Sequence, residues 1–153
     1  MSLIKRKKNI KLELWLFILM VFLLTSVIAG AQELADQGEK YLQRFSICKD
    51  IIEKNPVLEK NFFTSQDEKV VAWIRFSYSS ANNFKLYWEW ISPQGKLHHR
   101  GEVEMEAGKY HNYRTWYWIK IKENYSSKLV GEWKVKVYIN QILLDEKNFF
   151  VIE

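Results

Sequence analysis

The sequence predicts an all-β protein, an antiparallel β-sandwich of about seven strands that follows an N-terminal hydrophobic signal or anchor helix. Two observations support this prediction. Apolar and polar residues alternate at period two in several short segments, and turn-forming residues separate these segments at intervals of roughly 8–15 residues. No convincing pattern for a long helix appears among these segments.

The alternation is clearest in residues 128–153. One side of the first strand is apolar and the other polar, with Trp133, Val135, Val137 and Ile139 opposite Lys134, Lys136, Tyr138 and Asn140. Asn140-Gln141 interrupts this pattern, and a second apolar run follows from Ile142 to Ile152. We expect a β-hairpin, and because an isolated hairpin is barely stable in water, the rest of the chain must cover its apolar face.

Residues 1–31 have the three parts of a secretory signal peptide: a basic cluster at residues 5–11, an uncharged apolar run at 14–24 and the small residues Ala29, Gly30 and Ala31. Cleavage is expected between Ala31 and Gln32. The alternative is an uncleaved anchor, because the 20 residues from Leu12 to Ala31 are just enough to span a hydrocarbon core of ~30 Å.

The charge balance argues against a nucleic-acid-binding protein. Residues 1–31 contain five of the 23 basic residues and one of the 18 acidic residues, so the remainder has 18 basic and 17 acidic residues and a net charge of +1. The single cysteine, Cys48, allows no intramolecular disulfide. We expect Cys48 to be a small buried apolar residue rather than a reactive thiol.

The first elements after the signal segment are the least distinct. Residues 32–43 are polar and are expected to form a tether, and residues 44–153 the sandwich. Residues 44–52 fit either a strand or an amphipathic helix; we favour a strand, which Pro56 should end. The apolar pair Phe62-Phe63 precedes turn-forming residues and is not assigned to a strand.

The middle of the chain contains four further strand patterns. These are rich in β-branched and aromatic residues or alternate strictly, and they cover residues 70–78, 84–91, 97–105 and 113–121. Residues 92–95, Ser-Pro-Gln-Gly, form a strong turn signal, and Ala107-Gly108-Lys109 is expected to turn again.

Two motifs resemble exported bacterial immunoglobulin-like domains. The run G-E-W-K-V-K-V-Y at 131–138, with L-L at 143–144 and F-F-V at 149–151, is similar to the last two strands of such domains. The run W-E-W-I-S-P-Q-G-K at 88–96 resembles their middle, where a tryptophan strand enters a turn. The resemblance implies an immunoglobulin-like fold for about residues 45–152, and it implies no catalytic residue because many such domains are uncharacterised accessory modules.

The chain offers little that predicts chemistry. His98 and His99 are adjacent, so we expect them to point to opposite faces of a strand, from which they cannot both bind one metal ion. The four glutamates that could act as an acid–base pair of a small hydrolase fit a solvated sheet face better: Glu89, Glu102, Glu104 and Glu106. We therefore expect no catalytic residue, no metal site and no cofactor.

The tryptophans suggest a binding surface instead. Residues 113–121 carry aromatic side chains on both faces, but a sandwich strand has only one core face. Because Arg114 and Lys120 are costly to bury, we expect them to point outward together with Trp116 and Trp118, as a site for a protein or a sugar ring. The alternative is that the two tryptophans pack beneath the tether or a loop.

The sequence therefore favours an exported, non-enzymatic binding or scaffolding module of the bacterial cell envelope. The expected partner is another envelope protein, a carbohydrate is the alternative, and a small hydrolase is a remote one. The expected location is the periplasm, the cell surface or the medium, or the inner membrane if residues 12–31 remain as an anchor.

Overall fold

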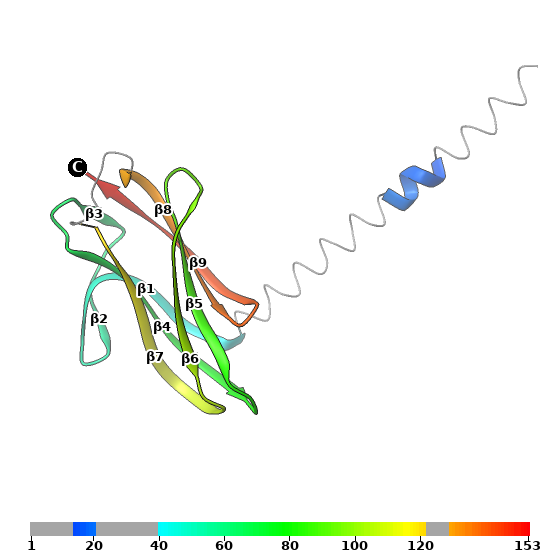
Figure 1. Cartoon of the computed structure of the whole chain (residues 1–153), viewed down its shortest axis with the longest axis horizontal. Coiled ribbons are helices and arrows are strands. Elements are labelled where there is room, and N and C mark those ends of the chain that lie inside the picture. Colours follow the sequence, from blue (N-terminus) through cyan, green and yellow to red (C-terminus); the bar gives the residue numbers. More distant parts are fainter. Residues whose placement is uncertain (1–13, 21–39, 122–128) are drawn as a thin grey trace, which may run out of the picture. The chain divides into compact units, whose positions relative to one another are not determined.

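A computed structural model describes residues 14–20, 40–121 and 129–153, and the chain divides into two compact units, residues 1–34 and 35–153 (Figure 1). In the first unit, residues 14–20 are helical with exposed side chains. Within the three described ranges, no helix has the length and apolar content needed to cross a membrane. The remaining residues of the predicted signal segment, including its cleavage site, lie outside the described residues, as do residues 32–39 of the predicted tether.

The second unit is a sandwich of two sheets. The first sheet has the order β2-β1-β4-β7 and the second the order β3-β9-β8-β5-β6. The strands are β1 (Leu42–Ile52), β2 (Asn55–Glu59), β3 (Phe62–Thr64), β4 (Lys69–Ser80), β5 (Phe84–Ile91), β6 (Leu97–Met105), β7 (Gly108–Lys120), β8 (Gly131–Ile139) and β9 (Ile142–Ile152). Neighbouring strands are antiparallel except β3 and β9, which are parallel.

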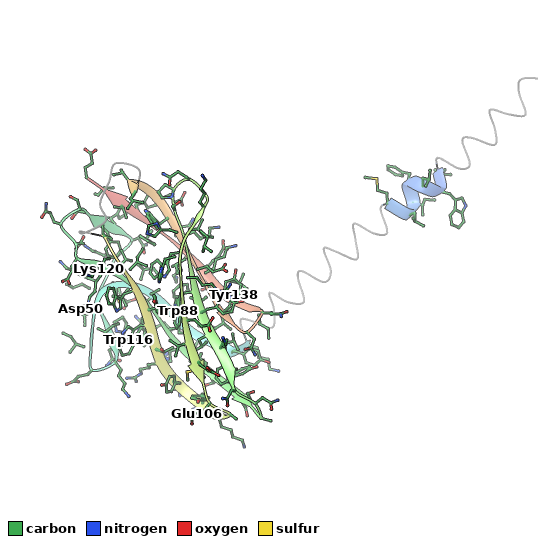
Figure 2. The ribbon with its side chains drawn as sticks, in the orientation of Figure 1. Asp50, Trp88, Glu106, Trp116, Lys120 and Tyr138 are labelled. Atoms are coloured by element: carbon green, nitrogen blue, oxygen red, sulfur yellow. The ribbon has the colours of Figure 1, made fainter. Side chains whose placement is uncertain are left out.

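The apolar side of each alternating strand faces the space between the sheets. The inward residues of β5 and β8 are buried as the sequence predicts: Phe84, Leu86, Trp88, Trp90, Trp133, Val135, Val137 and Ile139. Figure 2 places Trp88 inside the sandwich, with Trp116 and Tyr138 on opposite outer sides. Burial of these large side chains is the main stabilising term for a domain whose one described cysteine is free.

The predicted hairpin is present as β8 and β9, and its turn is held by β5. Asn140 has a positive φ of 52°, which asparagine tolerates better than most residues. The Asn140 N–H donates to the Lys85 carbonyl at 2.7 Å, and the Lys85 N–H donates to Asn140 Oδ1 at 2.9 Å. This pair of hydrogen bonds explains how the turn forms without a glycine.

The described residues form nine strands rather than about seven, because two short ones were not predicted. Residues 44–52 are a strand, as favoured, but Pro56 does not end it: β1 turns at Glu53 and Lys54, with φ of 49° and 64°, and Pro56 lies in β2. β2 is an edge strand, where proline is tolerated. β3 contains the Phe62-Phe63 pair, and its Phe63 is buried beside Phe149 with ring centroids 5.7 Å apart.

Both sheets end on the same side of the sandwich. β7 is the last strand of the first sheet, β6 is the last strand of the second, and the short connection at Glu106 and Ala107 joins them (Figure 1). The side chain of Tyr117 reaches from β7 to His99 of β6, where Nε2 of the histidine lies 3.2 Å from the tyrosine hydroxyl. The open side of the sandwich is therefore formed by β6 and by β7, which carries five tyrosine and tryptophan residues.

Candidate functional site

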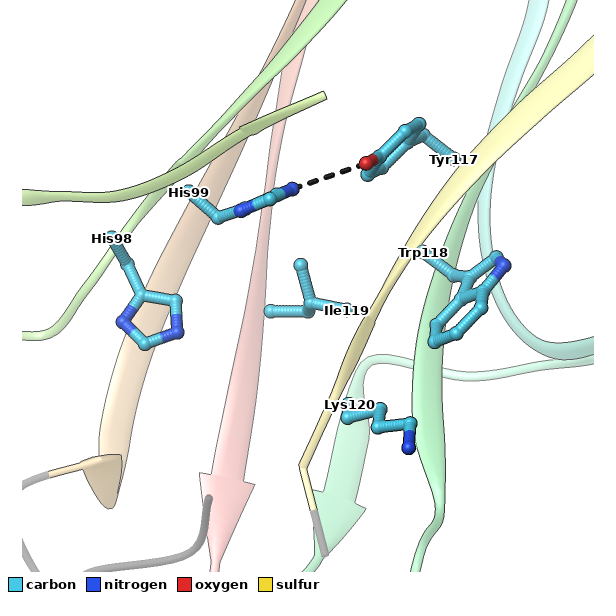
Figure 3. A pocket seen from close by; sticks show the side chains of 6 residues that line it. All are labelled: His98, His99, Tyr117, Trp118, Ile119 and Lys120. Atoms are coloured by element: carbon cyan, nitrogen blue, oxygen red, sulfur yellow. Dashed lines mark hydrogen bonds between the residues drawn. The ribbon is translucent and has the colours of Figure 1, made fainter. Parts of the chain in front are cut away.

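The outer face of β7 carries the four residues that the sequence predicts to point outward. Ile119 and Ile121 face the core and are buried. The side chains of opposite parity lie on the other face, and of these Arg114 is exposed, Trp116 and Lys120 are half-buried, and Trp118 is 44% exposed. Figure 3 shows Trp118 on the side of β7 that faces away from His99.

On this face, each outward residue of β7 lies opposite a residue of β4 with a similar side chain, apolar beside apolar and cationic beside cationic. Trp118 pairs with Val71, and Trp116 pairs with Trp73. The flanking pairs are both cationic, Arg114 with Arg75 and Lys120 with Lys69. Like charges that lie directly opposite are destabilising in a sheet, so the Arg114–Arg75 flank is suited to an anionic group, whereas Lys69 at the other flank already pairs with Asp50.

The two tryptophans of β7 differ because the β1–β2 hairpin covers one of them. Trp116 packs on a small cluster formed by Cys48, Val71 and Trp73, which lies outside the main core. The Trp73 indole N–H donates to the Lys54 carbonyl at 2.9 Å, which holds the hairpin turn over this cluster. Trp116 is thus partly a packing residue, and the β1–β2 hairpin covers its cluster.

An open groove of about 380 Å³ remains between the hairpin turn and β7. Its walls include both tryptophans of β7, two acidic residues and two lysines, and it is lined by Asp50, Ile51, Glu53, Lys54, Lys69, Val71, Trp116 and Trp118. Asp50 accepts from Lys69 at 2.8 Å, and this hydrogen bond is the main cause of the lowered pKa of Asp50. The groove is therefore apolar on the β7 side and charged at its rim, as protein-binding surfaces commonly are.

An arginine row crosses the outer face at one level of the first sheet. The pairing brings Arg44 of β1 opposite Arg75 of β4, which lies opposite Arg114 of β7. Arg44 forms an ion pair with Glu59, but Nε of Arg75 is buried and has no hydrogen-bond partner among the described residues. Sequence reasoning identified only Arg114, because the alignment of three strands that are far apart in the chain cannot be read from local periodicity.

A second hollow of about 400 Å³ lies between the edges of β6 and β7. It is lined by His98, His99, Tyr117, Trp118, Ile119 and Lys120 (Figure 3). The two histidines line the same hollow, which corrects the expectation that they point to opposite faces. The reason is a β-bulge: Trp90 pairs with His99 and Ile91 with Leu97, so His98 is an extra residue that shifts the alternation.

The hollow contains two histidines as possible metal ligands. Within residues 14–20, 40–121 and 129–153, no group of three or more histidine, cysteine, aspartate or glutamate side chains is placed to hold a metal ion. His98 lies edge-on to Trp133, and burial lowers the pKa of His98, which favours the neutral ring at neutral pH.

Two of the four glutamates considered for acid–base chemistry form ion pairs across the sheet. Lys85 pairs with Glu102, and this contact lowers the pKa of Glu102. Arg100 lies 3.7 Å from Glu89 and also stacks over Tyr87 at 4.0 Å. These pairs fit a solvated outer face of the second sheet.

Comparison with known proteins identifies the fold but no family. No family model and no curated protein matches the chain. Among solved structures, an immunoglobulin-like protein from Pseudomonas aeruginosa is similar, with a TM-score of 0.52 and 16% sequence identity over 74% of this chain and 95% of that one. At such low identity the likeness concerns architecture alone, and it shows that the sandwich of this chain has an immunoglobulin-like fold.

Proposed function

We propose that this chain is a non-enzymatic binding module, and that the outer face of β4 and β7 binds a partner protein. The observation that carries the proposal is the exposed indole of Trp118, which lies beside the half-buried Trp116 and between two pairs of cationic residues. Tryptophan and arginine are the residues that most often dominate binding energy at protein interfaces.

The packing around the site favours a protein over a carbohydrate. A sugar ring stacks on an aromatic side chain whose face is exposed to solvent. Trp116 is instead half-buried, because it packs on the cluster beneath the β1–β2 hairpin. One exposed indole in a groove with a charged rim is closer to an interface anchor with polar surroundings. The immunoglobulin-like fold is compatible with such a role and supplies no catalytic group by itself.

The partner can be sought with one matched pair of variants. Trp118→Ala removes the exposed ring, and Phe62→Ala removes another exposed aromatic ring that lies on β3, in the other sheet. We expect partners retained by the wild-type chain from a bacterial envelope extract to be lost with Trp118→Ala and kept with Phe62→Ala. If both variants retain the partners equally, the outer face of β4 and β7 is not the binding site. Specific retention of a glycan on an array would favour the carbohydrate alternative.

We also propose that the chain is exported, because residues 1–31 combine a basic start, an apolar run and the small residues that precede Gln32. Export places the module in the envelope or outside the cell, where an envelope protein is available as a partner. N-terminal sequencing of the expressed protein tests this directly. A chain that begins at Gln32 supports a cleaved signal, and one that begins at Met1 and fractionates with membranes supports an anchor.

A further inference from the structure

The free edge of β7 presents its backbone groups at known positions. The Ile121 N–H donates to the Glu68 carbonyl at 3.0 Å, so this residue is hydrogen-bonded toward β4. The register from Lys69↔Lys120 to Phe76↔Tyr113 is regular. In an antiparallel ladder, alternate residues direct both backbone groups to the same neighbour. Tyr117 and Ile119 therefore bond to β4, while the N–H and C=O groups of Arg114, Trp116, Trp118 and Lys120 point to the open side.

That side of β7 has room for another chain. Among the described residues, no strand pairs with the outer edge of β7. The hollow of about 400 Å³ lies along this edge at Tyr117 to Lys120 (Figure 3). The bulge that interrupts the β4–β7 pairing lies between Tyr110 and Tyr113, at the other end of the strand, so the part from Tyr113 to Lys120 is regular. A regular, unpaired edge is a template for a further strand.

We infer that an extended, acidic segment of the partner protein adds to β7 as a fifth strand of the first sheet. This inference rests on the proposed function, and it specifies how the partner is recognised. Partner residues opposite Arg114, Trp116 and Trp118 direct their side chains to the same outer face. The residues between them point toward the hollow that contains His98, His99 and Ile119.

The charges on the outer face define the chemistry of the segment. An acidic side chain opposite Arg114 would pair with that guanidinium, which itself lies opposite the cationic Arg75. Apolar or flat side chains opposite Trp116 and Trp118 would extend the apolar part of the ladder. A carboxylate at the Arg114 flank would lie beside two arginines that are opposite each other, whereas at the other flank Lys69 already forms an ion pair with Asp50.

The same charges disfavour one pairing of β7 with a second copy of this chain. An antiparallel pairing of two β7 strands that sets Trp116 of one copy opposite Trp118 of the other also sets Arg114 opposite Lys120. That register adds two cation–cation contacts to an edge that is already positively charged. An acidic segment satisfies the same edge without this repulsion.

A display library of random linear peptides, selected on the full chain in mild detergent, tests the inference. We expect selected peptides to alternate in character and to contain carboxylates. Each peptide is then made in two N-methylated forms, one methylated at odd positions and one at even positions. A strand that pairs on one side uses only alternate N–H groups, so one form should bind about tenfold more weakly and the other should bind normally.

Two protein variants test the same edge from the other side. Trp118→Ala removes the ring, whereas Trp118→Pro also removes an N–H that points outward and is not bonded to β4. We expect the proline variant to bind about tenfold more weakly than the alanine variant. Backbone amides of Trp116 and Trp118 should exchange with solvent more slowly when a selected peptide is bound. If the proline variant does not fold, the methylated peptides and the amide exchange still show whether the peptide pairs with the backbone of β7.

The outcomes separate this inference from the proposed function. Peptides that need the Trp118 ring but tolerate both methylation patterns would overturn strand addition and leave the binding face intact. Peptides that ignore Trp118→Ala would overturn both. Selection of basic peptides, absence of any selected peptide, or dimerisation of the chain through β7 would each overturn the acidic segment as the occupant.

Discussion

The ring of Tyr117 lies on Gly101, so close that a Cβ atom on the glycine would stand 2.4 Å from Cε1 and Cζ of the ring. The same ring is stacked between Trp88 and His99, at centroid distances of 5.9 and 5.6 Å. Tyr117 belongs to one sheet and Gly101 to the other, so this contact joins the two sheets at their open side. The ring cannot move away from Gly101 without disturbing these two stacking contacts.

Gly101→Ala should therefore destabilise the sandwich by about 1–3 kcal/mol, as expected when an extra methyl group is forced into a packed site. Urea unfolding followed by tryptophan fluorescence measures the change. Tyr117→Leu in the same chain should reduce the effect of Gly101→Ala, because the ring that clashes is gone. Additive effects of the two substitutions would contradict this explanation, since residues in contact should couple.

Trp133→Ala should cost about 3–5 kcal/mol, the usual loss for removing a large aromatic side chain from a core. Trp133 is buried, stacks on Phe149 at 6.0 Å and donates from its indole to the Leu129 carbonyl at 2.8 Å. Trp118→Ala is the matched control and should cost less than about 1 kcal/mol, because Trp118 is 44% exposed whereas Trp133 is 2% exposed. Equal losses in the two variants would show that Trp118 is a core residue.

Asp67 should make stability depend on acid pH. Burial raises the pKa of this carboxyl, but hydrogen bonds from Lys60, the Thr64 N–H and Lys49 outweigh it and lower the pKa to about 2. Because the folded state favours the carboxylate, its contribution is complete above about pH 4 and is lost as the pH falls toward about 2. Asp67→Asn should cost about 2 kcal/mol at neutral pH.

The difference between wild type and Asp67→Asn should therefore shrink as the pH falls through that range, and urea unfolding at several pH values measures it. Glu104→Gln is a suitable control, because the Glu104 side chain is exposed on the outer face of the second sheet. If the stability difference between wild type and Asp67→Asn does not change with pH, the Asp67 carboxylate does not stabilise the fold through its charge.

Cys48 should be unreactive in the folded protein. The side chain is fully buried, and burial raises the pKa of its thiol to about 11, although a backbone hydrogen bond with Val57 opposes the shift. Since the thiolate is the reactive form, a thiol reagent at about pH 8 should label the chain only after unfolding. Rapid labelling under native conditions would show that the β1–β2 hairpin opens.

Local periodicity predicted the strands that have one apolar face and one polar face. β5 and β8 follow the expected alternation residue by residue, because one of their faces packs into the core and the other meets solvent. β3 could not be predicted in this way. Three residues are too few for a period, and the strand exists because Phe63 packs beside Phe149, a residue far along the chain.

The candidate site was only partly predictable for the same reason. The outward side of β7 follows from the cost of burying Arg114 and Lys120, and the strand has that orientation. The cover over Trp116 depends on the Trp73–Lys54 hydrogen bond, and the shared hollow of His98 and His99 depends on a bulge. Both arise from pairing between strands, which a single sequence does not reveal.

The order of strands in the second sheet has a consequence for synthesis. β5 and β6 leave the ribosome early, but β8 and β9, which fill the middle of that sheet, come later in the chain. Until they arrive, Trp88 and Trp90 have no partners on one side and stay accessible to holding chaperones. A sandwich completed by such distant pairings is expected to close only after its last strands have been made.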